Sequence, residues 1–189
     1  MVAQAMVRKA RDGLDAANCV HAFQPAEGNG EVVIVWREPQ GFWCRTMIDW
    51  LSAAETLVYD FKTTGLNVAP HRVGYMMADA GWDIQAAMIE RGLNAINEKL
   101  AGRCRFRFVA QEDKPPNAVT VCELSESVMT MGRKKLAVAL EIWNRCITTD
   151  IWPAYAAGGV YVPEYPGWKE SQWLEREVSE FSNDLIMAG

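Results

Sequence analysis

The chain has 189 residues, half of them hydrophobic and 23% charged, with a net charge of −5 at neutral pH. This length and composition predict a single globular domain over residues 1–189. The acidic net charge argues against a protein that coats nucleic acid through a generally basic surface. It does not exclude an enzyme that acts on nucleic acid, which needs only a local basic track around its site. With no apolar run long enough to span a bilayer and no signal-peptide pattern, we expect a cytoplasmic protein without a membrane partner.

The first half of the chain predicts one helix followed by three strands. Residues 1–22 are rich in helix formers, and Gly13 is a candidate break. The β-branched run 31–37 predicts a strand, and after a Pro-Gln-Gly turn residues 42–50 complete a hairpin. Residues 57–62 predict the third strand of the sheet.

The second half of the chain alternates helices with two further strands. A helical stripe of apolar residues runs through 82–100, and alternating polarity in 104–109 predicts a strand with one buried face. Ser125 is a candidate N-cap for a long helix over 125–146. The other expected elements are a short helix at 70–79, a strand at 118–123, and a final helix near 170–187 in an irregular extension from about residue 153.

This order of elements predicts an α/β fold, with a mixed central β-sheet flanked by helices. The five cysteines include no Cys-x-x-Cys pair, which argues against a zinc ribbon, an iron–sulfur cluster and a disulfide framework. We therefore expect free, mostly buried thiols. The eight tryptophans are expected to anchor the core or an interface between chains.

Asp60 and Lys62 are the most informative residues for function. They lie two apart in a predicted strand, so both side chains share one face of the sheet. Asp49, at the end of the preceding strand, supplies a second carboxylate. Two carboxylates that hold Mg²⁺, beside a lysine that orients water, form equipment for hydrolysing a phosphodiester. The alternatives are a turn or cap role for Asp49, a plain Asp60–Lys62 salt bridge, and an ordinary strand-edge Lys62.

Four segments together resemble the PD-(D/E)xK nuclease superfamily, and within it the phage and prophage exonucleases of the exonuclease VIII (RecE) type. They are a Glu-headed strand at 31–36, a segment ending in the metal-binding aspartate at 44–51, an Asp-x-Lys-Thr-Thr signature at 58–64, and a glutamine helix at 82–87. Residues 106–116, and 143–146 together with 152–155, resemble the family's later segments. Ile89 stands where the family often has tyrosine, and Met47 where it often has a basic residue.

The resemblance implies a restriction-endonuclease-like core and a Mg²⁺- or Mn²⁺-dependent exodeoxyribonuclease. Such enzymes degrade linear duplex DNA from its ends in phage recombination. They leave a single-stranded tail for a strand-annealing partner protein, and many form rings around DNA. We therefore expect a homo-oligomer from a phage or prophage. The alternatives are a structure-specific endonuclease on the same fold and a non-catalytic module that binds DNA or a protein.

The expected metal ligands are Asp49, Asp60, the backbone carbonyl of Phe61, and Glu31. The alternative for Glu31 is a solvated residue at the start of its strand. Gln85 lies among apolar neighbours, so we expect it to hydrogen-bond inside the cleft rather than on the surface. His21 is the only candidate for the upstream histidine that related proteins carry, with a helix-end role as its alternative.

Seven basic residues are candidate contacts to DNA phosphates, which would position DNA without reading its sequence. Each taken singly also fits a solvated surface charge, and the run within the long helix is the best local patch. They are Arg72, Arg103, Arg105, Arg107, Arg133, Lys134 and Lys135.

Overall fold

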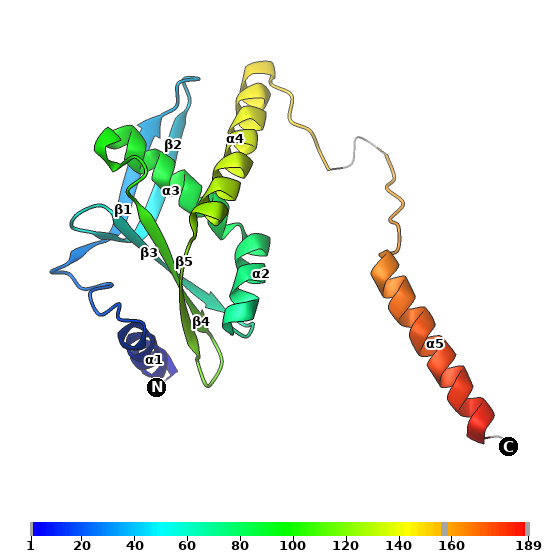
Figure 1. Ribbon diagram of the computed structural model, residues 1–189. Helices are drawn as coiled ribbons and strands as arrows, with labels where there is room; N and C mark the ends of the chain where they lie inside the picture. The colour runs from blue at the N-terminus through cyan, green and yellow to red at the C-terminus, as the bar shows by residue number, and fades with distance from the viewer. Residues whose placement is uncertain (1, 156–158, 188–189) are drawn as a thin grey trace. The chain divides into compact units, whose positions relative to one another are not determined.

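The computed structural model describes residues 2–155 and 159–187, and it divides the chain into two compact units (Figure 1). The first unit, Met1–Asp150, contains the sheet. The second unit, Ile151–Gly189, contains helix α5 (Gly167–Met187) and corresponds to the extension expected from about residue 153. The site considered below lies within the first unit.

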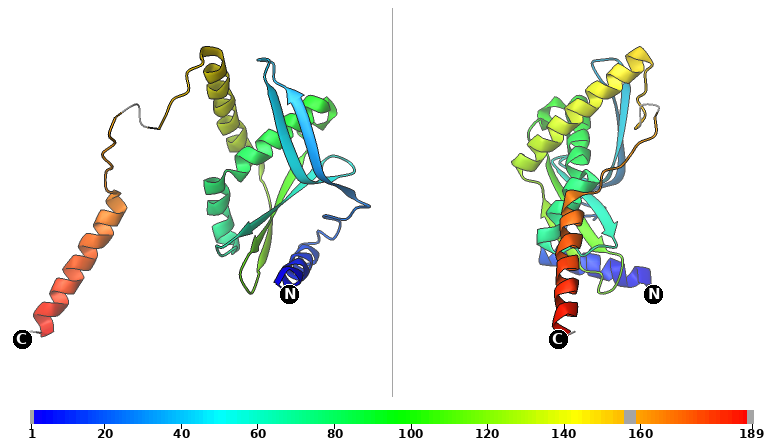
Figure 2. Two further views of the ribbon diagram at one scale, coloured as in Figure 1. Left: turned by 180° about the vertical axis from the view of Figure 1, so that it is seen from behind. Right: turned by 90° about the vertical axis from the view of Figure 1, so that its right-hand side faces the viewer.

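The first unit is built on a five-stranded mixed sheet in the order β1-β2-β3-β4-β5 (Figures 1 and 2). Strands β3 and β4 pair in parallel, and the other neighbouring strands pair antiparallel. This arrangement confirms the predicted mixed sheet, and each strand begins or ends within a few residues of its prediction. The strands are β1 (Gly28–Arg37), β2 (Trp43–Ser52), β3 (Leu57–Thr64), β4 (Arg105–Glu112) and β5 (Val119–Glu123).

The helices of the first unit also correspond to the predicted ones, with two corrections. The first helix ends at Ala16, running past Gly13 but not reaching residue 22, and the third ends at Ile96 before a separate 3₁₀ turn. The N-cap prediction is confirmed, because the Ser125 hydroxyl accepts the Val128 N–H. The elements are α1 (Val2–Ala16), α2 (Pro70–Ala80), α3 (Trp82–Ile96), the 3₁₀ turn Glu98–Leu100, and α4 (Glu126–Thr149).

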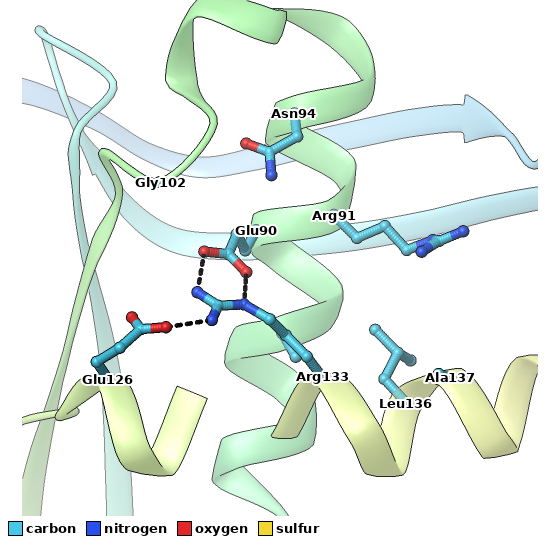
Figure 3. Close-up of a pocket in the computed structure, with 9 residues that line it drawn as sticks. Glu90, Arg91, Asn94, Gly102, Glu126, Arg133, Leu136 and Ala137 are labelled. Carbon is cyan, nitrogen blue, oxygen red and sulfur yellow. Dashed lines mark hydrogen bonds and ion pairs between the residues drawn. The ribbon is translucent and has the colours of Figure 1, made fainter. Parts of the chain in front are cut away.

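Helices α3 and α4 are joined by ion pairs to buried carboxylates. The Arg133 guanidinium donates to both oxygens of Glu90, at 2.6 and 2.8 Å, and to Glu126 at 2.5 Å. Figure 3 shows Glu90 of α3 bonded to Arg133 of α4, which also contacts Glu126, and all three residues line a pocket of about 650 Å³ between the two helices. Farther along, Lys135 pairs with Asp83 at 2.7 Å. The contact is close because Gly132 leaves no side chain between α4 and the Asp83 backbone.

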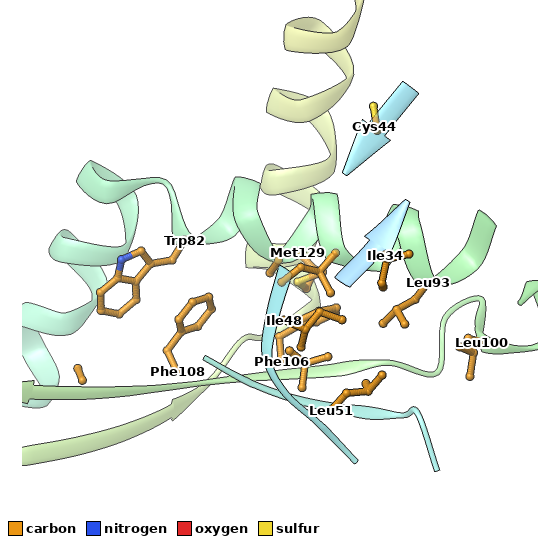
Figure 4. Close-up of a cluster of buried hydrophobic side chains, with 14 of the residues drawn as sticks. Ile34, Cys44, Ile48, Leu51, Trp82, Leu93, Leu100, Phe106, Phe108 and Met129 are labelled. Carbon is orange, nitrogen blue, oxygen red and sulfur yellow. The ribbon is translucent and has the colours of Figure 1, made fainter. Parts of the chain in front are cut away.

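The larger core lies between the sheet and α3 (Figure 4). Ile48, Phe106 and Phe108 extend from the sheet toward Leu93 and Trp82 on α3, and all five are buried. The Trp82 ring stacks on Phe108 with centroids 5.0 Å apart. This packing fixes the first turn of α3 against the middle of the sheet.

A second core covers the opposite face of the sheet beneath α1. It contains Leu14 from α1, Cys19 and Ala22 from the following loop, and Trp50 and Tyr59 from the strands. The Trp50 and Tyr59 rings meet edge to face, with centroids 5.6 Å apart. Helices therefore lie on both faces of the sheet, as the order of elements predicts.

The regular alternation of side chains between the two faces of the sheet is interrupted in β2 at Asp49. Ile48 and Leu51 pack on the α3 side, whereas Trp50 packs on the α1 side, so strict alternation breaks between residues 48 and 51. In the ladder with β1, Gly30 pairs with Trp50 and Val32 with Ile48, which sets Glu31 opposite Asp49. Glu31 has a positive φ of 51°. Both strands are thus irregular at the same point, beside the predicted site.

All five cysteines are free, with Cys19, Cys44 and Cys146 buried, which confirms the expectation of mostly buried thiols. Of the eight tryptophans, only Trp36, Trp50 and Trp82 are buried, and the other five are exposed. The sequence prediction of core anchoring therefore holds for three of them. Within residues 2–155 and 159–187, no helix is both long and apolar enough to cross a membrane.

Candidate functional site

Asp60 is the central residue of the candidate site. It lies on β3, on the face that meets α3, and its residue surface is only 2% exposed. Its Oδ1 forms an ion pair with the Lys62 ammonium, and its Oδ2 accepts a hydrogen bond from the Gln85 amide at 2.5 Å. The predicted common face of Asp60 and Lys62 is therefore confirmed. Gln85 is half-buried and bonded to the Asp60 carboxylate, which agrees with the expected hydrogen-bonding role rather than with a plain surface position.

Gln85 reaches Asp60 because of how α3 begins. Gly81 adopts the left-handed conformation, with φ of 68°, which ends α2 and lets α3 start at the next residue. Glycine takes this conformation without steric cost. One turn into α3, Gln85 faces β3, while Trp82 is fixed on Phe108. The chain turn at Gly81 and the stacked ring together position the amide.

Asp49 joins the site from the neighbouring strand. The β2–β3 ladder pairs Leu51 with Val58 and Trp50 with Tyr59, so the next position along the same register sets Asp49 opposite Asp60. There the Asp49 Oδ2 accepts the backbone N–H of Phe61 at 2.8 Å. A side-chain carboxylate thus replaces a ladder acceptor, and it is held beside Asp60 by that bond.

The two carboxylates affect each other electrostatically. Burial raises the pKa of Asp60 above its ordinary value, and the Asp49 charge raises it further. The Lys62 ammonium and the Gln85 amide oppose this rise because they stabilise the ionised form. A buried carboxylate with a raised pKa and a second acid nearby would gain from a further positive charge.

The donor set fits a hard divalent cation. Ionised Asp49 and Asp60 keep free lone pairs beyond the hydrogen bonds described, and carboxylate, carbonyl and water oxygens are the ligands that Mg²⁺ and Mn²⁺ take. Throughout the described part of the chain, no three or more His, Cys, Asp or Glu side chains form a cluster able to hold a metal ion. A cation here would rely on two carboxylates, with the predicted Phe61 carbonyl and water completing its shell.

Glu31 lies near Asp49 but does not complete a three-carboxylate cluster. Both residues line a cavity of about 770 Å³, together with Phe61 and residues of α1 and the loop that follows it. Glu31 is exposed. Its role as a metal ligand, directly or through water, stays a prediction. The cavity makes Asp49 and Glu31 accessible to a small molecule or to part of a larger one.

Of the two roles considered for His21, the contacts in the structure favour the one at the helix end. His21 Nε2 lies 3.2 Å from the Tyr59 hydroxyl, within the aromatic cluster on the α1 side of the sheet. Tyr59 neighbours Asp60 in β3, so its side chain lies on the other face of the strand. Burial raises the pKa of Tyr59 to about 12, and Arg107 also donates to its hydroxyl at 2.7 Å. His21 therefore serves the packing of α1.

Four of the seven basic residues predicted to contact DNA form ion pairs with acids of this chain. Arg133 and Lys135 are paired with acids of α3 and α4, as described above, and Arg107 and Arg105 pair with Glu123 at 2.6 and 3.7 Å. These ion pairs count against free phosphate contacts by the four residues. Arg72, Arg103 and Lys134 are exposed and stay candidates. The sequence analysis missed the buried acids Asp83 and Glu90, although their spacing of seven residues places both on one face of α3.

The mixed sheet, the Asp-x-Lys pair with its buried aspartate, and the second carboxylate from the adjacent strand define a protein of the PD-(D/E)xK class. The chain belongs to the family described as "PDDEXK-like domain of unknown function (DUF3799)", whose model matches residues 2–163. This family confirms the superfamily part of the resemblance and leaves the exonuclease VIII type as a finer expectation.

One solved structure supports the same fold. A crystal structure from Eubacterium rectale, described as a "Putative exonuclease", matches with a TM-score of 0.60 and 12% identity. The match covers 86% of this chain but only 60% of that one, so the present chain spans well under the whole of that protein. A second structure, of SSO0001, has a TM-score of 0.36 and 12% identity over 80% of this chain and 81% of that one. No match was found among curated proteins.

Proposed function

We propose that this protein is a divalent-metal-dependent nuclease that hydrolyses the phosphodiester backbone of DNA. The observation that carries the proposal is the buried Asp60, paired with Lys62 and Gln85 and facing Asp49 across a diverging pair of strands. If the Asp60–Lys62 pair were only a structural salt bridge, the second carboxylate of Asp49 beside it would be unfavourable, because it raises the pKa of Asp60 further. Membership of the PDDEXK-like family supports the same proposal.

Each residue has a role that follows from its contacts. Asp49 and Asp60 would hold the cation, which when bound lowers the pKa of a bound water and neutralises charge on the phosphate. Lys62, partly exposed next to Asp60, donates to the attacking water or to phosphate oxygens as negative charge develops. Gln85 fixes the orientation of the Asp60 carboxylate. Glu31, exposed beside Asp49, would bind the cation directly or through a water molecule.

At a finer level we propose a Mg²⁺- or Mn²⁺-dependent exonuclease that acts on the ends of linear duplex DNA, as in phage recombination. The resemblance of the 58–64 and 82–87 segments supports it, as does the description of the Eubacterium rectale structure as a "Putative exonuclease". We further propose a homo-oligomer that hands its product to a strand-annealing protein. The exposed Trp143 on α4 and Trp173 on α5 support an interface, because aromatic residues are enriched in interface cores.

The proposal is tested with linear duplex DNA labelled at one end, incubated with Mg²⁺, with Mn²⁺ and with EDTA. We expect progressive shortening from the ends with either metal and none with EDTA. An Asp60→Asn variant that folds normally serves as the control, because a neutral amide is a much poorer ligand for Mg²⁺. Normal degradation by this variant would reject the assignment of the site.

A structure-specific endonuclease is the second candidate, because the same carboxylates and lysine would serve either reaction. Closed-circular and linear substrates of the same sequence separate the two. Nicking of the circle at a rate close to the degradation of linear DNA would favour the endonuclease. A folded wild-type protein that binds DNA but cleaves neither substrate would instead favour the non-catalytic module.

A further inference from the structure

The β1–β2 hairpin carries an exposed face with apolar and aromatic side chains. Its other face packs into the core beneath α3 through Ile34, Trp36, Cys44 and Ile48. The outward positions alternate with these, as the strand period requires. Trp43 is 68% exposed, although its size and apolar ring would favour burial. The other exposed apolar residues of this face are Val33, Val35 and Met47.

The same face carries cations beside the indole. Arg37 pairs directly across the ladder with Trp43, and Arg45 pairs with Val35. Arg37 donates to the Gly41 carbonyl at 2.9 Å within the hairpin, and neither arginine forms an ion pair among the residues described. The nearby acid Glu38 cannot neutralise them, because it is buried on the other face and bonded to Arg91. In a chain of net charge −5, this is a local basic surface.

This face leads to the candidate site along the strands. On β2 it runs from Trp43 through Arg45 and Met47 to Asp49, and on β1 it ends at Glu31, opposite Asp49. Six residues of strand span about 20 Å at 3.4 Å per residue. That is the length of about six stacked nucleotides. The distance suits a segment of polynucleotide that reaches from the hairpin to Asp49 and Glu31.

We propose that the outer face of the β1–β2 hairpin binds single-stranded nucleic acid, with a base stacked on Trp43 and phosphates on Arg37 and Arg45. This inference rests on the proposed nuclease function and names the substrate strand that the site receives. An aromatic platform flanked by cations is the usual means of binding a single strand without reading its sequence. A duplex hides its base faces within the stack, so Trp43 favours the unpaired strand. A purely apolar protein contact would not need the two arginines that flank Trp43, because each would have to lose water without gaining an ion-pair partner.

The test measures binding apart from cleavage. Fluorescence anisotropy of a labelled thymidine oligomer, with EDTA present, gives the affinity of the full chain for a single strand. We expect Trp43→Ala to weaken this affinity by about 5- to 150-fold, the effect of removing one stacked base. Arg45→Gln should weaken it too, and should reduce the slope of log affinity against log salt by about one phosphate. The affinity for a blunt duplex of the same length should fall less in the Trp43→Ala variant.

Trp168→Ala is the matched control, because Trp168 is also 68% exposed but lies in the second unit. It should bind the single strand as the wild type does. Unchanged binding by a folded Trp43→Ala variant would overturn the inference, as would an equal loss in both tryptophan variants. A lower mass in light scattering for Trp43→Ala, with unchanged DNA affinity, would assign the face to contact between copies. Cleavage by the wild type with Mg²⁺ is scored separately, so failure of the hairpin face and failure of the nuclease remain distinguishable.

Discussion

The carboxylate of Asp49 accepts the backbone N–H of Phe61 at 2.8 Å, at the point where β2 and β3 stop pairing through their main chains. One side chain therefore satisfies a backbone donor and presents a charge to Asp60. The proposed site uses the second property, whereas the sheet uses the first. The two can be separated, because an amide oxygen accepts the same hydrogen bond without the charge.

Asp49→Asn and Asp49→Ala should therefore differ in stability but agree in activity. Alanine leaves the Phe61 N–H without its partner, and we expect a loss of about 1–2 kcal/mol in the free energy of unfolding. Asparagine should lose less than about 1 kcal/mol. Both variants should lose metal-dependent cleavage. Urea unfolding and the end-labelled duplex assay measure the two effects, and an active, stable alanine variant would contradict both roles.

Asp60→Asn should raise stability in the absence of metal. The folded-state pKa of Asp60 lies above its ordinary value because of burial, so the folded protein holds the proton more tightly than the unfolded chain. Protonated Asp60 therefore contributes to the free energy of unfolding at low pH, and this contribution is lost as the pH rises through the raised pKa. At pH 7 with EDTA, the neutral asparagine variant should therefore melt above the wild type. The difference should shrink as the pH falls toward 4.

Metal should reverse that order. A cation at 100 times its dissociation constant stabilises the protein that binds it by about 2.7 kcal/mol. Wild type should gain this on addition of Mg²⁺ or Mn²⁺, whereas Asp60→Asn should gain little. Thermal melts with EDTA and with each metal make the comparison without any substrate. Equal metal-dependent shifts in both proteins would place the cation elsewhere.

Lys62→Ala should lose turnover more than DNA binding. The ammonium lies beside the Asp60 carboxylate, where negative charge would develop during hydrolysis. Removing one such electrostatic donor costs on the order of 10²-fold in rate. Single-turnover cleavage gives the rate, and anisotropy in EDTA gives the affinity. Lys99→Ala, at an exposed turn, is the control and should match the wild type. A Lys62→Ala variant with full rate but weak binding would make Lys62 a phosphate anchor.

The sequence could predict the elements and the centre of the site because both depend on local patterns. The β-branched and helical periods specify the strands and helices, and the two-residue spacing of Asp60 and Lys62 is enough to set them on one face. Ser125 could likewise be assigned from its position before a helix. These features need no knowledge of which segments meet in space.

The remaining features depend on contacts between distant segments. From the sequence, Arg133 and Lys135 form part of a basic patch. In the structure they pair with Glu90 and Asp83 of α3, which lie 43 and 52 residues earlier in the chain. The sequence allows His21 either a helix-end role or a metal-ligand role, and the contact with Tyr59 is what favours the first. The positive φ of Glu31, at the point where β2 becomes irregular, could not be predicted from the sequence. Glutamate rarely adopts a positive φ, so its presence at this position does not indicate one.

Gly132→Ala tests the close contact that fixes α3, and with it Gln85, over the sheet. A Cβ at this position would lie 2.1 Å from the Asp83 carbonyl oxygen, so α4 must move away from α3. We expect a loss of about 1–3 kcal/mol from overpacking, despite the better helix propensity of alanine. Gly74→Ala is the matched helical control, because its Cβ meets nothing within 4 Å. That variant should gain about 0.5–1 kcal/mol. Chemical denaturation of both variants measures the difference, and a Gly132→Ala protein as stable as Gly74→Ala would contradict the close packing of the two helices.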